Sequence, residues 1–291
     1  MSLKNNFKKH QAKWQRMGKL WAKFSPSGRP SKDDIKNYNR LLKIALKDIE
    51  QPKVVLLGST PEIRNLLYKY KNVKVYCVDM TEDMYQSMKA FIKHKNSREK
   101  FIRSNWLEMS KKIKDADVVI GDYVSGNIGA HLDKFLLEIQ KILKPNGYFI
   151  VREMLIVKST KPIKSVRATF KRVINKYEQG KLNLRDASSE FASEFILKGA
   201  FLKKNSSSSI SYFEEDIRAL FEDIKNKGSK SEKRVLSYFK NSWWQIKDKY
   251  WIFYTKEKQE KFYTKYFQIR RILYSNDYKI TKESPIYLLQ K

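Results

Sequence analysis

The sequence predicts an α/β fold built on a mostly parallel, doubly wound sheet with helices on both faces. Short, continuously apolar runs such as Lys53–Leu57 and Asp117–Ile120 recur in the first half of the chain, as expected of strands buried on both faces. Helical patterns separate these runs, and repeated β–α units of this length imply parallel strands joined by right-handed crossovers. Two closely spaced runs near the C-terminus predict an antiparallel hairpin, so the sheet is not wholly parallel.

The individual elements follow from local patterns in chain order. Ser31 followed by Asp34 resembles a capping box and predicts a helix start. Pro61 indicates the first turn of another helix. Further helices are expected over Thr81–Lys93, Leu132–Leu143 and Lys256–Lys265. The predicted strands are residues 53–57, 73–78, 101–102, 117–120, 148–151, 267–273 and 285–289.

Four segments are expected. Residues 1–50 form a helical N-terminal extension over a ligand crevice, and residues 51–158 form the α/β core. Residues 159–250 contain helical stretches without a convincing strand and are predicted to be a helical insertion or lid, with Ser206–Ser209 as a flexible connector. Residues 251–291 supply a helix and the hairpin that completes the core sheet.

Composition excludes several classes of protein. The single cysteine, Cys77, rules out a disulfide framework, and three scattered histidines make a metal site improbable, so no metal is predicted. No stretch approaches the roughly 18–20 apolar residues that span a bilayer. The basic N-terminus lacks the apolar region of a signal peptide. A soluble, cytoplasmic protein without a membrane partner is therefore expected.

The charge of the chain has two readings. Sixty-one basic and thirty-one acidic residues give a net charge of +30, which suggests a polyanionic partner such as nucleic acid. The lysines are spread over nearly every segment, however, which equally fits a biased codon usage. Both readings stay open, and no oligomeric state is predicted.

Four candidate ligand-binding residues fall where predicted strands end: Gly58, Asp79, Asn105 and Asp122. In an open α/β sheet, ligands bind outside the carboxyl ends of the strands. Gly58 has no Cβ and lets a ligand approach the backbone, and Asp79 is placed to accept hydrogen bonds from both hydroxyls of a ribose. The alternatives are a simple turn at Gly58 and a helix cap at Asp79.

The loop after the first strand narrows the choice of cofactor. It reads Gly58-Ser-Thr-Pro-Glu62 and lacks the G-x-G-x-x-G pattern of dinucleotide-binding proteins. Pro61 and Glu62 would crowd and repel a pyrophosphate at the helix N-terminus. An acidic residue is compatible with a positively charged sulfonium cofactor, so the loop favours a methyl donor over a nicotinamide.

A specific resemblance follows from these segments. The order VVLLGSTPEIRNLL, VYCVDMTEDM, SNWLEM, ADVVIGDYVSGNI and ILKPNGYFIVRE resembles class I S-adenosylmethionine-dependent methyltransferases, which have a Rossmann-like sheet. The likeness is strongest to a subgroup with an LG-x-TPE loop and an upstream Arg-Pro-Ser segment, here Arg29-Pro30-Ser31. It covers about residues 25–155 well and 250–290 loosely.

The resemblance implies roles for individual residues. Gly58, Ser59 and Thr60 would line the methionine part of S-adenosylmethionine, with Glu62 nearby. Asp79 would bind the ribose. Met80, Asn105 and Trp106 would contact the adenine, although Asn105 stands where the family more often has Asp. Asp122 and Tyr123 would face the transferring methyl group. Helix entry for Met80 and core packing for Trp106 are the alternatives.

The sequence leaves the methyl acceptor open. Asp122 is the leading candidate for a general base, with Tyr123 and His131 behind it. The Asn/Asp-Pro-Pro-Tyr tetrapeptide of exocyclic base methylases is absent; the corresponding stretch is Asp122-Tyr-Val-Ser125. This absence argues against amino methylation of DNA or RNA bases by that route and leaves RNA ring positions and small molecules open. A small-molecule acceptor is expected, with an RNA methyltransferase or a nucleic-acid-binding protein as the alternative. A nicotinamide-dependent oxidoreductase is the least favoured reading.

Overall fold

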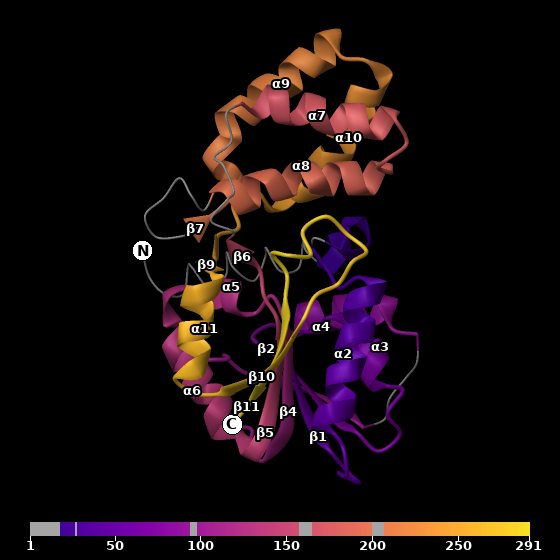
Figure 1. Ribbon diagram of the computed structural model, residues 1–291. Coiled ribbons are helices and arrows are strands. Elements are labelled where there is room, and N and C mark those ends of the chain that lie inside the picture. The colour runs from indigo at the N-terminus through magenta and orange to yellow at the C-terminus, as the bar shows by residue number, and fades with distance from the viewer. Residues whose placement is uncertain (1–17, 27, 94–97, 157–164, 200–206) are drawn as a thin grey trace. The chain divides into compact units, whose positions relative to one another are not determined.

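The computed structural model describes residues 18–26, 28–93, 98–156, 165–199 and 207–291 (Figure 1). The chain divides into two compact units. Residues 30–155 and 254–291 form the first unit, and residues 19–29 and 156–253 form the second. The first unit contains every strand end singled out by the sequence.

The first unit is built on a seven-stranded sheet with the order β10-β11-β5-β4-β1-β2-β3. The strands β1 to β5 are parallel to one another, whereas β11 runs antiparallel to both β5 and β10. The mostly parallel sheet with a C-terminal antiparallel hairpin is thus confirmed. The strands are β1 (Lys53–Leu57), β2 (Lys74–Asp79), β3 (Glu99–Arg103), β4 (Ala116–Asp122), β5 (Leu143–Arg152), β10 (Gln268–Leu273) and β11 (Ile286–Gln290).

Helices cover both faces of this sheet. On one face α2 packs against β5, β11 and α3, and on the other α6 packs against β5 and α11 (Figure 1). The helices of this unit are α2 (Lys32–Ala45), α3 (Pro61–Leu67), α4 (Glu82–Met88), α5 (Ser125–Ile128), α6 (Leu132–Ile142) and α11 (Lys256–Thr264). The helix predicted over Thr81–Lys93 is shorter, because α4 ends at Met88 and a 3-10 turn, Lys89–Phe91, follows.

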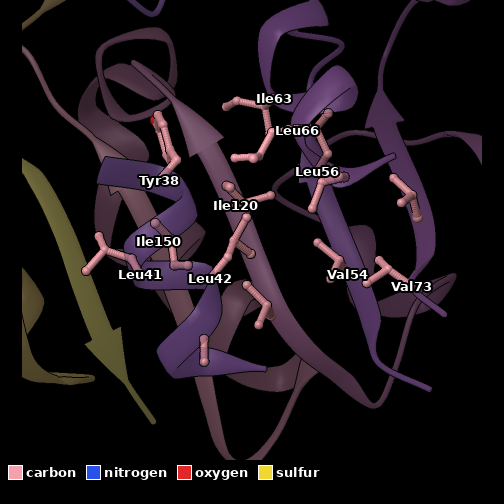
Figure 2. Close-up of a cluster of buried hydrophobic side chains, with 14 of the residues drawn as sticks. Tyr38, Leu41, Leu42, Val54, Leu56, Ile63, Leu66, Val73, Ile120 and Ile150 are labelled. Atoms are coloured by element: carbon pink, nitrogen blue, oxygen red, sulfur yellow. The ribbon is translucent and has the colours of Figure 1, made fainter. Parts of the chain in front are cut away.

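The core under α2 explains why this segment is helical. Tyr38, Leu41, Leu42 and Ala45 recur at helical spacing and are buried against strand residues such as Ile150 (Figure 2). The capping box predicted at Ser31 is present: its hydroxyl accepts from the Asp34 backbone N–H, and the Asp34 carboxylate accepts from the Ser31 N–H. The capping box holds the start of α2 at the carboxyl end of the sheet.

The second unit is mainly helical, as predicted for this part of the chain. Its helices are α7 (Val166–Glu178), α8 (Leu184–Gly199), α9 (Glu214–Lys227) and α10 (Lys230–Lys240). Phe191 packs on Phe195 and Phe239, with ring centroids 4.7 and 4.9 Å apart, so these aromatic residues form the core of the unit. Phe191 is fully buried.

Four very short strands complete the structure. They pair as β6 with β9 and β7 with β8. The serine run is not a flexible connector where it is described: Ser208 lies in β7, and both Ser208 and Ser209 are buried. Their bounds are β6 (Leu155–Ile156), β7 (Ser207–Ser208), β8 (Trp251–Ile252) and β9 (Tyr254–Thr255). No helix among the described residues is long and apolar enough to cross a membrane.

Candidate functional site

The sheet order places the candidate site at the carboxyl ends of central strands. Strands β2 and β4 lie on either side of β1, so the chain winds in opposite directions from β1. The carboxyl ends of β1, β2 and β4 carry Gly58, Asp79 and Asp122. A change of winding direction in a parallel sheet opens a crevice at this edge, which is where such folds bind ligands.

Gly58 is held in a tight turn beside an aromatic wall. It has a φ of +85°, a conformation that favours glycine, and its N–H donates to the Val78 carbonyl at 2.8 Å. The Trp106 indole N–H donates to the same carbonyl at 2.7 Å. A Cβ on Gly58 would meet the Trp106 ring at 3.7 Å. One strand-end carbonyl thus ties the glycine turn and Trp106 together.

The next two residues of the loop offer polar groups. Ser59 and Thr60 are both buried, and the Ser59 hydroxyl has no hydrogen-bond partner within the described part of the chain. Glu62 lies in the first turn of α3 and is partly exposed. A buried, unpartnered hydroxyl is costly, so Ser59 is suited to hydrogen-bonding a ligand.

Asp79 ends β2 and takes part in the turn that precedes α4. Its Oδ1 accepts from the Thr81 backbone N–H at 3.3 Å, a local turn that precedes α4. Its side chain is also only partly buried at the carboxyl end of the sheet. Met80 is likewise partly buried, and its carbonyl accepts from Arg103 Nε at 3.2 Å. Asp79 therefore shapes the turn and presents its carboxylate at the crevice edge.

Asn105 and Trp106 differ in their surroundings. Asn105 is exposed, and its Oδ1 accepts from the Leu107 backbone N–H at 3.0 Å. Trp106 is partly buried, with its ring centroid 6.2 Å from that of Phe135. Trp106 therefore joins the aromatic core under α6 and also borders the Gly58 turn.

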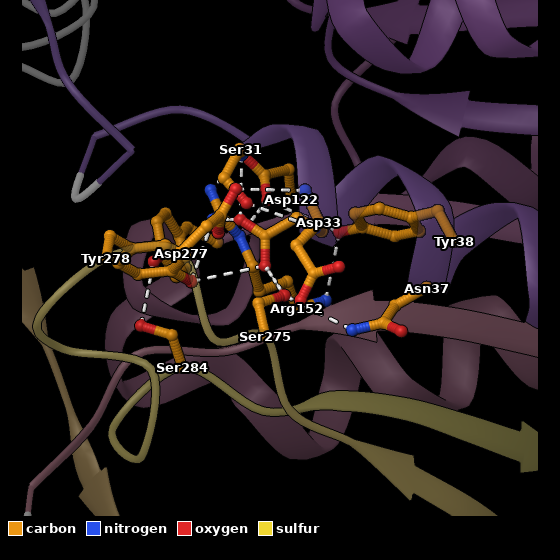
Figure 3. Close-up of polar contacts among 12 residues, drawn as sticks. Ser31, Asp33, Asn37, Tyr38, Asp122, Arg152, Ser275, Asp277, Tyr278 and Ser284 are labelled. Carbon is orange, nitrogen blue, oxygen red and sulfur yellow. Dashed lines mark hydrogen bonds and ion pairs between the residues drawn. The ribbon is translucent and has the colours of Figure 1, made fainter.

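The end of β4 carries a buried ion-pair network (Figure 3). Arg152 Nε and Nη2 donate to Asp122 Oδ1 and Oδ2 at 2.6 and 3.0 Å, while Arg152 Nη1 contacts Asp34. All three side chains are at most 3% exposed. Burial alone would lower the pKa of Arg152, but the negative charges of Asp122 and Asp34 raise it well above its ordinary value. Arg152 stays charged.

Two tyrosines complete the surroundings of this network. The Tyr38 hydroxyl donates to the Gly121 carbonyl at 2.8 Å and accepts from the Arg152 backbone N–H at 3.2 Å. Tyr123 has a φ of +52°, unusual for a residue with a side chain, and its ring lies 4.1 Å from the Arg152 guanidinium. Burial raises the pKa of Tyr123 well above its ordinary value, so its phenol stays protonated.

This environment does not suit Asp122 to the role of general base. Burial raises its pKa, an effect that Arg152 opposes, and both of its oxygens already accept hydrogen bonds from the guanidinium. The arrangement fits a structural pair that fixes the turn at Tyr123. His131, the other base considered, is exposed in a 3-10 turn.

A second buried carboxyl was missed by the sequence reasoning. Glu153 follows Arg152 at the end of β5, and its Oε1 accepts from the hydroxyls of Ser125 and Tyr263 at 2.6 and 2.5 Å. Burial raises its pKa to about 7, although both hydrogen bonds oppose the shift. The one sequence signal for this carboxyl is its position, since Arg152 and Glu153 directly follow the predicted strand 148–151.

The strand ends carry groups whose chemistry suits the parts of S-adenosylmethionine. An acidic residue at the β2 end suits a ribose, the buried Ser59 hydroxyl needs a partner, and the glycine turn allows close approach. The described residues contain no cluster of His, Cys, Asp or Glu side chains able to hold a metal ion.

Comparison with known proteins gives a domain match and a fold. A family model described as a methyltransferase domain matches residues 60–186. A comparison with curated protein sequences found no match. The PH0226 protein of Pyrococcus horikoshii is similar in structure at 15% identity, with 91% of this chain and 95% of that chain covered and a TM-score of 0.50.

Two further solved structures are similar. A Rhodobacter sphaeroides protein described as a Zn-dependent alcohol dehydrogenase has 11% identity, coverage of 97% and 98%, and a TM-score of 0.55. The N-methyltransferase NodS of Bradyrhizobium japonicum, in complex with S-adenosyl-L-homocysteine, has 8% identity, coverage of 90% and 89%, and a TM-score of 0.47. At such identities the likenesses with TM-scores of 0.50 and 0.55 show the fold alone. The methyltransferase-domain match over residues 60–186 and the sheet order support a class I S-adenosylmethionine-dependent methyltransferase.

Proposed function

We propose that this protein binds S-adenosylmethionine at the carboxyl ends of β1, β2 and β3 and catalyses methyl transfer beside the end of β4. The supporting observation is the convergence of Gly58, Asp79 and Asp122 at one sheet edge, in the chain order expected of the family. When bound, the cofactor supplies a methyl group on a sulfonium, which is a good leaving group.

Each part of the cofactor has proposed partners. Gly58, Ser59 and Thr60 hold the methionine part, and the buried Ser59 hydroxyl finds its missing hydrogen bond there. Asp79 accepts hydrogen bonds from the ribose hydroxyls. Met80, just after β2, and Asn105 and Trp106, just after β3, contact the adenine. Glu62 lies in the first turn of α3.

The end of β4 is proposed to align the acceptor with the methyl group. Arg152 holds Asp122 at two points, and the Tyr123 backbone at φ +52° continues directly from it. Alignment alone can provide effective molarities of about 10⁵ M or more, so a displacement of this kind does not require a base when the acceptor is already deprotonated. In this proposal Asp122 and Tyr123 position the acceptor and neither removes a proton.

The proposed acceptor is a small molecule, with RNA as the alternative. The test is transfer of tritium from S-[methyl-³H]adenosylmethionine to two separate pools, a metabolite fraction and total RNA. Label in the metabolite pool supports the proposal, and label in acid-precipitable RNA selects the alternative. Absence of label from both pools contradicts methyl transfer.

The matched variants for this assay are Asp79→Ala and Asp216→Ala. Asp216 is an exposed aspartate in the first turn of α9, far along the chain from the strand ends. Asp79→Ala should abolish or greatly reduce labelling, and Asp216→Ala should label like the wild type. Equal labelling by both variants would show that Asp79 does not bind the cofactor.

A further inference from the structure

The outward face of α2 carries a continuous row of positive charges. Lys32, Lys36, Arg40 and Lys43 on the helix, with Lys47 in the turn that follows, are all exposed. At 3.6 residues per turn these five side chains fall within an arc of about 80°. The row, named the α2 basic stripe, lies directly opposite the buried Leu41 and Leu42 side of the helix.

The cations of the stripe make few ion pairs, although Asp33 and Asp48 lie beside them in the chain. Within the described residues, the only ion pair made by the stripe joins Lys36 to Asp33 at 3.9 Å, with Lys36 70% exposed. Some cations elsewhere are paired more closely, as Arg218 is with Glu214 at 2.6 Å and Lys265 with Asp133 at 3.1 Å. The stripe is therefore a concentrated field of positive charge.

One further cation extends the stripe sideways onto the sheet. Arg271 of β10 pairs in register with Leu288 of β11, and opposed residues in an antiparallel pair point to the same face. Leu288 belongs to the core cluster under α2, so Arg271 points to the face of the sheet that α2 covers. Arg271 is exposed.

The chemistry of the stripe favours a nucleic acid over a membrane or a protein partner. A helix that inserts into a membrane surface needs a free apolar face, but the apolar face of α2 is buried in the core. Protein interfaces are rich in aromatic residues and poor in lysine, and the stripe has lysines and no aromatic residue. A row of flexible ammonium groups matches a sugar–phosphate backbone.

We propose that the α2 basic stripe binds the phosphate backbone of single-stranded RNA. From Lys32 to Lys47 the stripe is about 22 Å long at 1.5 Å per residue. A strand stacked at the 3.4 Å spacing of one duplex strand would place about six or seven phosphates along this length. Lys32 adjoins the capping box of α2, and Asp34 of that box contacts Arg152, so this end of the stripe lies near the carboxyl end of β5.

The test is fluorescence anisotropy with a fluorescein-labelled 20-nucleotide oligouridylate, titrated with the full chain at several salt concentrations. Six phosphate contacts predict a slope of log K against log salt of about −4 for single-stranded nucleic acid. Combining Lys36→Gln, Arg40→Gln and Lys43→Gln should reduce the slope to about −2 and lower the affinity about tenfold or more at 0.1 M salt. These side chains are exposed, so circular dichroism should match that of the wild type.

A matched variant removes the same charge from the opposite face of the sheet. It combines Lys256→Gln, Lys258→Gln and Lys261→Gln on α11, where all three lysines are exposed beside Glu257 and Glu260. This variant should bind the oligouridylate like the wild type. Equal loss of binding by both triple variants would overturn the proposal, because the overall charge of the chain would then explain the affinity.

Two other results would also overturn it. One is the absence of oligouridylate binding at 50 mM salt. The other is binding to vesicles of phosphatidylcholine and phosphatidylserine that the α2 variant weakens while oligouridylate binding stays unchanged. The assay contains no S-adenosylmethionine, so its outcome is independent of the proposed methyl transfer.

Discussion

Arg152 and Asp122 form a two-point ion pair at the carboxyl edge of the sheet, with Nε–Oδ1 and Nη2–Oδ2 distances of 2.6 and 3.0 Å. The partners come from adjacent strands and are paired in register. Since Arg152 also contacts Asp34 at the start of α2, one guanidinium links α2, β4 and β5. The pair fixes the backbone from which Tyr123 enters its left-handed conformation.

Removal of the guanidinium should destabilise the protein more than removal of one carboxylate. Arg152→Met leaves Asp34 and Asp122 buried without a cation, and loss of one partner of a buried pair costs about 3–5 kcal/mol. Asp122→Asn leaves Arg152 paired with Asp34, so the free energy of unfolding should fall by less, about 1–3 kcal/mol. Urea denaturation measures both values. The control Arg270→Met, at an exposed site, should stay within about 0.5 kcal/mol of the wild type; an Arg152→Met value in that range would contradict the account.

Gly58→Ala and Gly180→Ala separate backbone strain from ligand binding. Both glycines have positive φ, +85° and +70°, and an added Cβ meets only the Trp106 ring at 3.7 Å or nothing within 4 Å. Each variant should therefore lose about 1–2 kcal/mol of stability through the backbone alone. Only Gly58→Ala should weaken S-adenosylhomocysteine binding, by about tenfold or more, or about 1.4 kcal/mol. Calorimetric titration would refute this if both variants bound like the wild type.

Glu153 should make stability depend on pH near neutrality. Its pKa is raised to about 7 in the folded protein, against about 4.3 in an unfolded chain. The folded state therefore favours the protonated carboxyl, and this stabilisation is present below about pH 4.3 and lost as the pH rises through 7. Glu153→Gln has no carboxyl to ionise, so it should be more stable than the wild type at pH 8, by up to about 4 kcal/mol.

Urea midpoints from pH 5 to pH 8 measure this difference. It should shrink steadily towards the acidic end of the range. Glu215→Gln, at an exposed position on α9, should follow the wild-type curve throughout. A constant offset between Glu153→Gln and the wild type at every pH would contradict the buried carboxyl described above.

Trp106→Phe tests whether the hydrogen bond donated by the Trp106 indole contributes to cofactor affinity. Phenylalanine keeps an aromatic ring against Phe135 but loses the donor to the Val78 carbonyl, which still accepts from Gly58. A single hydrogen bond contributes about 1 kcal/mol, so S-adenosylhomocysteine affinity should fall about fivefold. Unchanged affinity together with lower stability would restrict Trp106 to core packing.

Much of the fold could be predicted because its signals are local. The apolar runs at Lys53–Leu57 and Asp117–Ile120 lie in the central strands β1 and β4, and the Ser31–Asp34 capping box starts α2 as expected. The convergence of Gly58, Asp79 and Asp122 follows from the geometry of any parallel sheet. Those positions required no knowledge of long-range contacts.

The electrostatics of the site required contacts between distant parts of the chain. Asp34 and Arg152 are 118 residues apart, and Glu153 and Tyr263 are 110 residues apart. Asp122 looks like an available base in the sequence because the arginine that holds it comes from another strand. The buried serines Ser208 and Ser209 were mistaken for a connector for the same reason: composition does not reveal which polar groups find partners in the fold.

The most direct test of the proposed cofactor site is isothermal titration calorimetry of the wild type and Asp79→Ala with S-adenosylmethionine, S-adenosylhomocysteine and NAD. The wild type should bind the first two and not NAD, and Asp79→Ala should bind them at least about tenfold more weakly, since loss of hydrogen bonds to a charged group costs about 1.5–3 kcal/mol. Wild-type-like binding by Asp79→Ala, or binding of NAD in place of S-adenosylmethionine, would contradict the site described here.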